Sequence, residues 1–181
     1  MQCDRWATIY DFEELQNQIK QIVKSNYTKG FYKLSIDKHS LFQGDIIKLD
    51  KKFAYLNKDG QFQAEYFSGF WIILGNSCDF DRDIKDLPFT NITPMQKLNG
   101  DVPEKIINGL KNFQNYKHMY IPSFDSNDEY FIDFTKIMTI SKEYLKSDIY
   151  NFKIAELTFD SWILLHSCLV RYFARDDGRN D

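Results

Sequence analysis

The sequence is poor in cysteine and has no long apolar run. Its three cysteines, Cys3, Cys78 and Cys168, are widely spaced and form no Cys-x-x-Cys pair. This pattern excludes a disulfide framework and is typical of free thiols in a reducing compartment, so we expect a cytoplasmic protein. No apolar stretch approaches the roughly 20 residues that a membrane-spanning helix needs. Residues 1–16 carry neither the basic region nor the apolar core of a signal peptide, so we expect no association with a membrane.

A surplus of basic residues is also absent. The chain has 23 Lys and Arg against 26 Asp and Glu, for a net charge of -3. Proteins that bind duplex DNA usually carry excess positive charge, because phosphate contacts dominate their affinity. We therefore expect no binding of duplex DNA, and a protein or a single-stranded nucleic acid stays open as the partner. Lys outnumbers Arg by 18 to 5, a bias typical of an AT-rich bacterial or phage genome.

Aromatic residues, in contrast, are abundant. They make up 17% of the chain, with 16 Phe and 11 Tyr. Large rings supply the burial that offsets chain entropy, so bulk disorder is excluded. A length of 181 residues fits one domain, and no Pro-, Gly- or Ser-rich linker divides the chain. We expect residues 1–181 to form a single domain.

Apolar residues recur at helical spacing in three segments, which predicts helices over residues 11–24, 101–116 and 158–175. Short apolar runs separated by turn residues fill much of the chain between them and predict strands. The polar cluster at residues 57–60 predicts a hairpin turn. The four large apolar residues at 70–73 predict a strand that is buried on both faces.

The order of these elements predicts an α+β fold. Short strands with tight turns, flanked by helices, are typical of a small bent β-barrel covered by helices. We expect the barrel over residues 41–141, with the helix at about 101–116 inserted in it. A helical extension over 1–40 precedes the barrel, and a helix over 158–175 follows it. Within the barrel, which we expect to close on itself, Pro94 should end a strand.

The densest polar segment, residues 76–83, follows the most apolar strand. Functional loops often follow strand ends, so Ser77, Cys78 and Asp79 are candidate catalytic residues at the rim of the barrel. Cys78 would act as a nucleophile and Asp79 as a general base or ligand. A reactive thiol needs a nearby base or a helix N-terminus to lower its pKa. The alternative interpretation, which we favour, is a structural turn in which Ser and Asp bond their own backbone.

The carboxylates of this segment could also suggest a metal site. Asp79, Asp81 and Asp83 alternate as in a calcium loop, but such a loop needs Gly at its sixth position and Glu at its twelfth, and neither is present. A hydrated magnesium ion held together with Asp45, a candidate binding residue, is a weaker alternative. The three histidines are too scattered to complete a zinc site. We therefore expect neither a metal nor another cofactor.

Three arginines are further candidate binding residues. Arg171 and Arg175 lie one turn apart near the end of the last predicted helix. There they could face a carboxylate such as Asp79 or a phosphate, or they could complement the helix dipole. Arg82 lies within the polar segment and could act beside Ser77. His166, on the last predicted helix, is interpreted as a core histidine.

Basic and aromatic residues alternate around the predicted hairpin. Rings and ammonium groups on a small barrel can bind the bases and phosphates of single-stranded nucleic acid. They can equally fill the barrel and protect its strand edges, an interpretation that the negative net charge favours. The residues concerned are Lys48, Lys51, Lys52, Lys58, Phe53, Tyr55, Phe62, Tyr66 and Phe67.

Residues 43–95 read QGDIIKLD, a variable hairpin, FWIILGNSCDFDRD and FTNITPM. This skeleton resembles the MazF/PemK family of plasmid-maintenance toxins, which implies an SH3-like barrel and matches Ser77 to the family's strand-end serine. The family usually places Arg-Pro before the apolar strand, where the arginine helps to stabilise the phosphate in RNA cleavage. Ser68, Gly69 and Phe70 stand there instead. The resemblance therefore implies the fold more directly than the activity.

Three functions follow as expectations. The first is a binding module of a bacterial or phage conflict system, such as a toxin–antitoxin or defence system, with a protein or single-stranded nucleic acid as its partner. The second, which the resemblance implies, is a MazF-like endoribonuclease that uses Ser77, Asp79 and an arginine of the last helix. The third is a thiol hydrolase built on Cys78. Whether the chain is an enzyme stays open.

Overall fold

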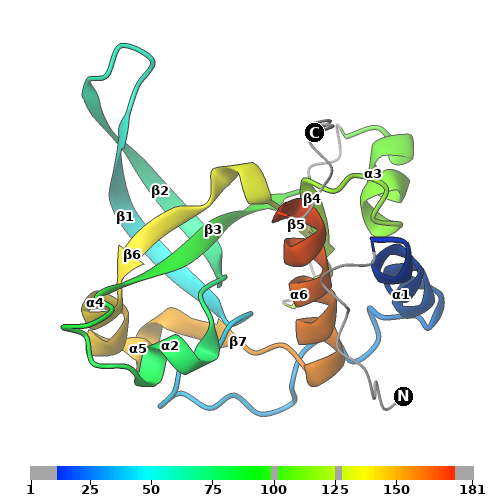
Figure 1. The fold of residues 1–181 in the computed structure, drawn as a ribbon, viewed down its shortest axis with the longest axis horizontal. Coiled ribbons are helices and arrows are strands. Elements are labelled where there is room, and N and C mark those ends of the chain that lie inside the picture. The colour runs from blue at the N-terminus through cyan, green and yellow to red at the C-terminus, as the bar shows by residue number, and fades with distance from the viewer. Residues whose placement is uncertain (1–11, 99–101, 125–127, 174–181) are drawn as a thin grey trace, which may run out of the picture. The chain divides into compact units, whose positions relative to one another are not determined.

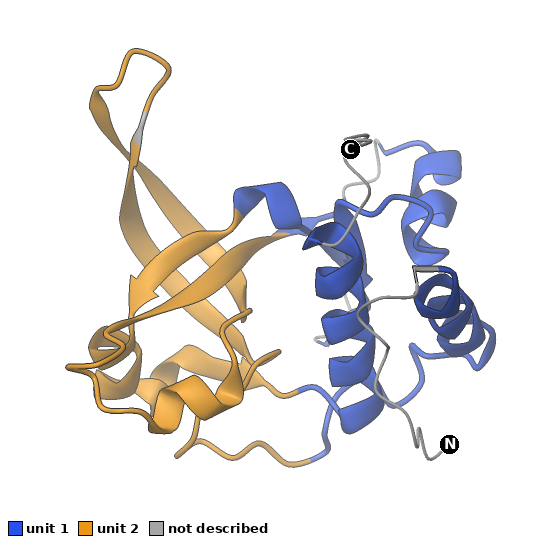
Figure 2. Ribbon diagram, in the orientation of Figure 1, with its two compact units in different colours: residues 1–34, 96–136, 157–181 blue, residues 35–95, 137–156 orange. Residues whose placement is uncertain are grey.

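A computed structural model shows an α+β fold, as predicted. It describes residues 12–98, 102–124 and 128–173, so Cys3 and Arg175 lie outside the described residues. The chain divides into two compact units (Figure 2). Unit 1 comprises residues 1–34, 96–136 and 157–181, and unit 2 comprises residues 35–95 and 137–156. Each unit is assembled from stretches that are far apart in the sequence.

Unit 2 contains an antiparallel sheet and three short helices. Its strands are β1 (Ile46–Leu56), β2 (Phe62–Ile73), β3 (Phe89–Lys97, the last two residues of which belong to unit 1), β6 (Met138–Ser141) and β7 (Lys153–Ala155). Its helices are α2 (Ser77–Asp81), α4 (Lys142–Ser147) and α5 (Ile149–Phe152). The strands follow the order β6-β3-β2-β1-β7 (Figure 1). No ladder joins β6 to β7 within the described residues, so the sheet is open and the predicted closure is not found.

β1 and β2 form one long hairpin, in which residues 46–56 pair with residues 72–62 without interruption. Asn57 builds the turn, because its side-chain oxygen accepts hydrogen bonds from the backbone N–H groups of Asp59 and Gln61. Gly60 completes the turn at φ +73°, a conformation that glycine adopts without strain. The predicted hairpin is confirmed. The apolar run at 70–73 is the second half of β2 rather than a strand of its own, so the hairpin is longer than predicted.

The core of unit 2 lies where this hairpin meets β3. Ile47 and Leu49 of β1, Trp71 and Ile73 of β2, and Ile92 of β3 are each at most 1% exposed. Burying one such side chain contributes about 1.5–3 kcal/mol. Alternate residues of each strand reach this core because successive side chains point to opposite faces of a sheet. The prediction that Trp71 lies in a buried strand is confirmed.

In its described residues, unit 1 contains three helices and a short hairpin. The helices are α1 (Phe12–Lys24), α3 (Glu104–Lys111) and α6 (Phe159–Phe173), and the hairpin joins β4 (His118–Ile121) to β5 (Tyr130–Asp133), followed by the 3-10 turn η1 (Phe134–Lys136). α1 packs against α6, and the apolar side chains of Leu15, Ile19, Leu164 and Leu165 are buried. The three predicted helices are confirmed, with α3 shorter than predicted.

Two departures from the sequence pattern have physical reasons. Pro94 does not end β3: it pairs with Trp71, and it lies beyond the last rung to β6, which joins Ile92 to Met138. The N–H group that proline lacks therefore interrupts none of the rungs between β3 and β6. The pattern predicted no element over residues 142–155, because α4, α5 and β7 are each too short to establish a period. Among the described helices, none is both long and apolar enough to cross a membrane.

Candidate functional site

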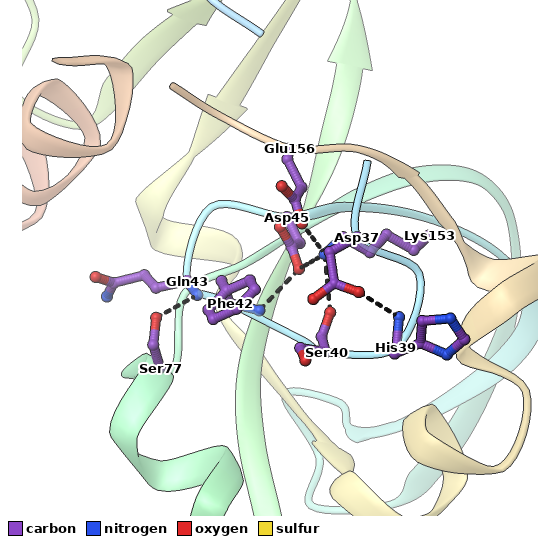
Figure 3. A network of polar contacts seen from close by, with 9 residues as sticks. All are labelled: Asp37, His39, Ser40, Phe42, Gln43, Asp45, Ser77, Lys153 and Glu156. Atoms are coloured by element: carbon purple, nitrogen blue, oxygen red, sulfur yellow. Dashed lines mark hydrogen bonds and ion pairs between the residues drawn. The ribbon is translucent and has the colours of Figure 1, made fainter. Parts of the chain in front are cut away.

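The predicted catalytic segment begins with a short helix rather than a loop. Asn76 caps α2, because its side-chain oxygen accepts a hydrogen bond from the N–H of Cys78 at 3.0 Å. The Oγ of Ser77 accepts a hydrogen bond from the N–H of Gln43 at 2.9 Å (Figure 3). The hydroxyl of Ser77 therefore joins α2 to the loop that precedes β1.

The structure brings the other predicted residues of this segment together on the same short helix. Cys78 is an exposed free thiol, and no hydrogen bond or ion pair reaches its sulfur within the described residues. Asp79 faces Arg82 with Oδ1 and Nε 3.6 Å apart, but their side chains are 33% and 66% exposed, so this pair is weak. Ser77, Cys78 and Asp79 are thus neighbours, and no general base stands beside the serine or the cysteine among the described residues.

Two lysines that sequence reasoning missed hold the C-terminal end of α2. Nζ of Lys142 donates to the carbonyl of Asp79 at 2.6 Å, and Nζ of Lys146 donates to the carbonyl of Phe80 at 2.5 Å. The last carbonyls of a helix lack intrahelical partners and carry partial negative charge, so ammonium groups stabilise them. Lys142 is fully buried. No feature of the sequence separates these two residues from the other lysines.

Asp45 lies in a buried ionic cluster with Lys153 and Glu156. Its carboxylate accepts a hydrogen bond from the N–H of Phe42 at 2.7 Å and pairs with Nζ of Lys153 at 2.8 Å. Lys153 also donates to the carbonyl of Ser40 at 2.8 Å and to the carboxylate of Glu156 (Figure 3). Asp45, Lys153 and Glu156 are each at most 2% exposed. The cluster joins the start of β1, the loop before it and β7.

This cluster contains two carboxyl groups for one ammonium group. Burial raises the pKa of Asp45 to about 6, because the interior disfavours the charged carboxylate, while Lys153 acts in the opposite direction. Since the carboxylate of Asp45 is enclosed with Lys153, it is not placed to hold a hydrated magnesium ion. Nowhere in the described part of the chain do three His, Cys, Asp or Glu side chains gather as a metal ion would require.

Arg171 lies in unit 1 and is buried. Its Nη1 donates to the carbonyl of Phe113 at 2.8 Å and its Nη2 to the carbonyl of Asn115 at 3.1 Å, so the guanidinium holds the turn that follows α3. Its contacts are those of a structural residue rather than of a group that faces a ligand. His166, on the same helix, packs against Trp162 with ring centroids 5.5 Å apart, and burial lowers its pKa. His166 is thus a half-buried histidine that packs on a neighbouring ring.

A groove of about 630 Å³ lies between β1 and β6, and sequence reasoning did not find it. It is lined by residues 51–55 of β1, by residues 137–141, which include β6, and by Tyr144 of α4. Successive side chains of a strand point to opposite faces. One face of a sheet would present only alternate residues of a strand. Five consecutive residues of each segment line the groove, so the edges of the two strands border it.

Both of these strand edges are unpaired along the groove within the described residues. β1 pairs with β7 only at Ile46 and Ile47, and β6 pairs only with β3. Lys51 and Lys52 are exposed, and no Asp or Glu lines the groove. Nζ of Lys51 lies 5.5 Å from the ring centroid of Tyr144, whose hydroxyl is buried with no hydrogen-bond partner among the described residues. The groove therefore offers unpaired peptide groups, positive charge and a phenol.

Comparison with protein-family models and with curated proteins finds no match to this chain. The resemblance of residues 43–95 to the MazF/PemK family therefore depends on the sequence skeleton alone.

Proposed function

We propose that this chain is a cytoplasmic binding module that takes an extended, acidic segment of a protein partner into the groove between β1 and β6. The observation that carries the proposal is that two unpaired strand edges border one groove. An unpaired edge presents a row of N–H and C=O groups, which an incoming strand can bond. A segment in this groove would extend the sheet at β1 or at β6.

Charge favours an acidic segment. Lys51 and Lys52 line the groove without a carboxylate among its lining residues, although the whole chain carries a net charge of -3. Such a local excess of positive charge attracts and orients an acidic ligand. The ring of Tyr144 borders the groove beside Lys51, whereas its hydroxyl is buried.

Single-stranded RNA is the alternative ligand, because its phosphates would meet the same lysines. Proteins that bind single strands also stack the bases on exposed rings. Phe53 does not offer such a surface, since it is buried and packs against Trp71 with ring centroids 4.5 Å apart. A peptide that bonds through its backbone needs no stacking surface, and we therefore favour it.

The resemblance to the MazF/PemK family supports a place in a bacterial or phage conflict system and an open SH3-like barrel for unit 2. The pairing of β1 with β7, the first and last strands of unit 2, also supports that barrel.

A MazF-like endoribonuclease is our second proposal. It is tested by cleavage of single-stranded RNA, which should be lost in Ser77→Ala. A thiol hydrolase is a third, and loss of hydrolysis in Cys78→Ser would support it. The exposed sulfur without a neighbouring base favours it least.

Lys52 provides a test of the binding proposal, and Lys48 provides the matched control. A labelled peptide of alternating Glu and Val residues should bind, as followed by fluorescence anisotropy. Lys52→Glu should weaken binding by up to roughly fivefold, since an exposed ion pair contributes up to about 1 kcal/mol. Lys48→Glu changes an exposed lysine on the same strand and the same face that does not line the groove, so it should bind nearly as the wild type does.

Two further peptides test the mode of binding. A peptide with Lys in place of Glu should not bind, because the groove repels it. The Glu–Val peptide with alternate backbone nitrogens methylated should lose binding, because it cannot donate to a strand edge. Equal weakening by both lysine variants would contradict the proposal. Binding of oligo(U) RNA but of neither acidic peptide would support the endoribonuclease instead.

A further inference from the structure

The outer part of the β1–β2 hairpin, residues 48–56 and 62–69, is a two-stranded ribbon that we call the distal arm. β3 pairs with β2 only at residues 71–73, so no described strand covers the edge of β2 within the arm. The arm runs out from the rest of unit 2 (Figure 1). Leu49 and Phe53 pack one face of the arm on the core of unit 2, whereas no described strand pairs with its β2 edge.

The two edges of the arm differ in charge. The β1 strand carries Lys48, Asp50, Lys51 and Lys52, whereas residues 62–69 of β2 carry Glu65 as their one charge and contain neither lysine nor proline. Lysine and proline are the residues with which proteins commonly prevent edge-to-edge pairing. The edge of β2 lacks this protection.

One face of the arm is also apolar and exposed. Phe62, Ala64 and Tyr66 lie on it, with Phe62 80% and Tyr66 61% exposed. The hydroxyl of Tyr66 bonds to Asp50 of the neighbouring strand, which holds the ring along this face. An exposed apolar stripe beside an unprotected strand edge is typical of a contact surface.

We propose that a second copy of this chain pairs its own β2 with this edge, antiparallel, to form a four-stranded ribbon. A two-fold contact pairs a strand with the same strand of the second copy. Charged residues of that strand can then oppose one another, and like charges destabilise the contact. Through β1, a contact centred on Lys51 and Lys52 would oppose these two lysines to themselves, which is destabilising. Through β2, pairing about Tyr66 avoids this. The opposed residues are then Glu65 with Phe67, Ala64 with Ser68, and Gln63 with Gly69.

The absence of opposed like charges makes the chain itself a fitting occupant for the β2 edge. The contact leaves the β1 edge, and with it the groove, open. The proposal is therefore independent of the ligand that the groove takes.

Sedimentation equilibrium of the full chain tests this contact. The wild type should be a reversible dimer, and Ala64→Lys should raise its dissociation constant about tenfold or more, which corresponds to about 1.4 kcal/mol. Ala54 pairs directly with Ala64 and is exposed on the same face, one strand farther from the contact. Ala54→Lys is therefore the matched control and should keep the wild-type dissociation constant. Tyr66→Lys should weaken the dimer most, because the new charge faces its own copy across the two-fold axis.

The far-UV circular dichroism of each variant shows whether it folds, since every substituted side chain is exposed in a single copy. A wild type that stays monomeric at every concentration would overturn the proposal. So would a dimer that Ala54→Lys and Ala64→Lys weaken equally, because the contact would then lie elsewhere.

Discussion

Asp45 links the stability of unit 2 to pH at the scale of one residue. Its carboxyl has a pKa of about 6 in the folded chain, above the ordinary value of about 3.9 for an unfolded Asp. Between these two values the folded chain holds the proton more tightly than the unfolded chain does. The contribution of Asp45 to the free energy of unfolding therefore falls as pH rises through this window and is constant above it.

We predict that Asp45→Asn removes this dependence. The quantity to compare is the free energy of unfolding of the wild type minus that of the variant. This difference should fall by up to about 3 kcal/mol between about pH 4 and about pH 7, because each unit of pKa difference corresponds to about 1.4 kcal/mol. Urea unfolding across this range measures it. Asp37→Asn is the control of opposite sign, because a backbone hydrogen bond from His39 lowers the pKa of Asp37. A wild-type advantage over Asp45→Asn that does not change with pH would contradict the prediction.

Arg171 and Arg82 form a second contrast between single residues. Arg171 is buried and donates to two main-chain carbonyls, whereas Arg82 is mostly exposed. Arg171→Met should lower the free energy of unfolding by about 2–4 kcal/mol, because it leaves buried acceptors without donors. Arg82→Met should change it by no more than about 0.5 kcal/mol. Similar urea midpoints for the two variants would show that the carbonyl contacts of Arg171 do not stabilise the fold.

At the scale of an element, Gly75 sets the approach of β2 to β3. A Cβ at this position would lie 1.9 Å from Oγ1 and 3.2 Å from Cβ of Thr90. The N–H of Gly75 also donates to the carbonyl of Asn91 at 3.1 Å, which keeps the two segments close. Gly75→Ala should therefore cost about 1–3 kcal/mol of unfolding free energy through overpacking.

A double-mutant cycle tests this cause. Thr90→Ala removes the nearest atom, so it should restore part of the stability that Gly75→Ala loses. Thermal unfolding of the four chains measures the coupling. If the double variant lost the sum of the two single losses of unfolding free energy, the two residues would not be in steric contact.

Elements that depend on local chemistry were predictable from the sequence. Asn57 and Gly60 carry the turn of the hairpin within four residues, and the apolar surface of α6 repeats over several turns. The continuity of β2 was less visible, because the small residues Ser68 and Gly69 interrupt its run of rings. α4, α5 and β7 depend on tertiary contacts, which short segments do not record in their own pattern.

The candidate site was predictable only in part, for the same reason. The polar segment at Ser77 stands out after an apolar strand. The main-chain carbonyls that accept hydrogen bonds from Lys142 and Lys153, in contrast, lie 63 and 113 residues away, and the sequence does not indicate which carbonyls these are. The groove joins two edges that are also far apart along the chain. Local patterns identify the segments, whereas the sites depend on which segments meet.

At the scale of the whole molecule, the two units interrupt one another along the chain. Unit 1 takes its residues from three stretches and unit 2 from two. Contacts of such long sequence separation slow folding, because loop closure must precede them.

This interleaving has a consequence for synthesis. While the nascent chain lengthens on the ribosome, β1 cannot pair with β7, and the carboxylate of Asp45 cannot pair with the ammonium group of Lys153, until these later residues have been synthesised. α1 likewise cannot pack until α6 has been synthesised. A chain stalled before residue 153 should therefore be digested by a protease as readily as an unfolded polypeptide. Resistance of such a stalled chain to the protease would show that unit 2 folds before residue 153 has been synthesised. We therefore expect unit 2 to complete its fold only after Lys153 has left the ribosome, which gives chaperones that hold emerging chains a long interval in which to act.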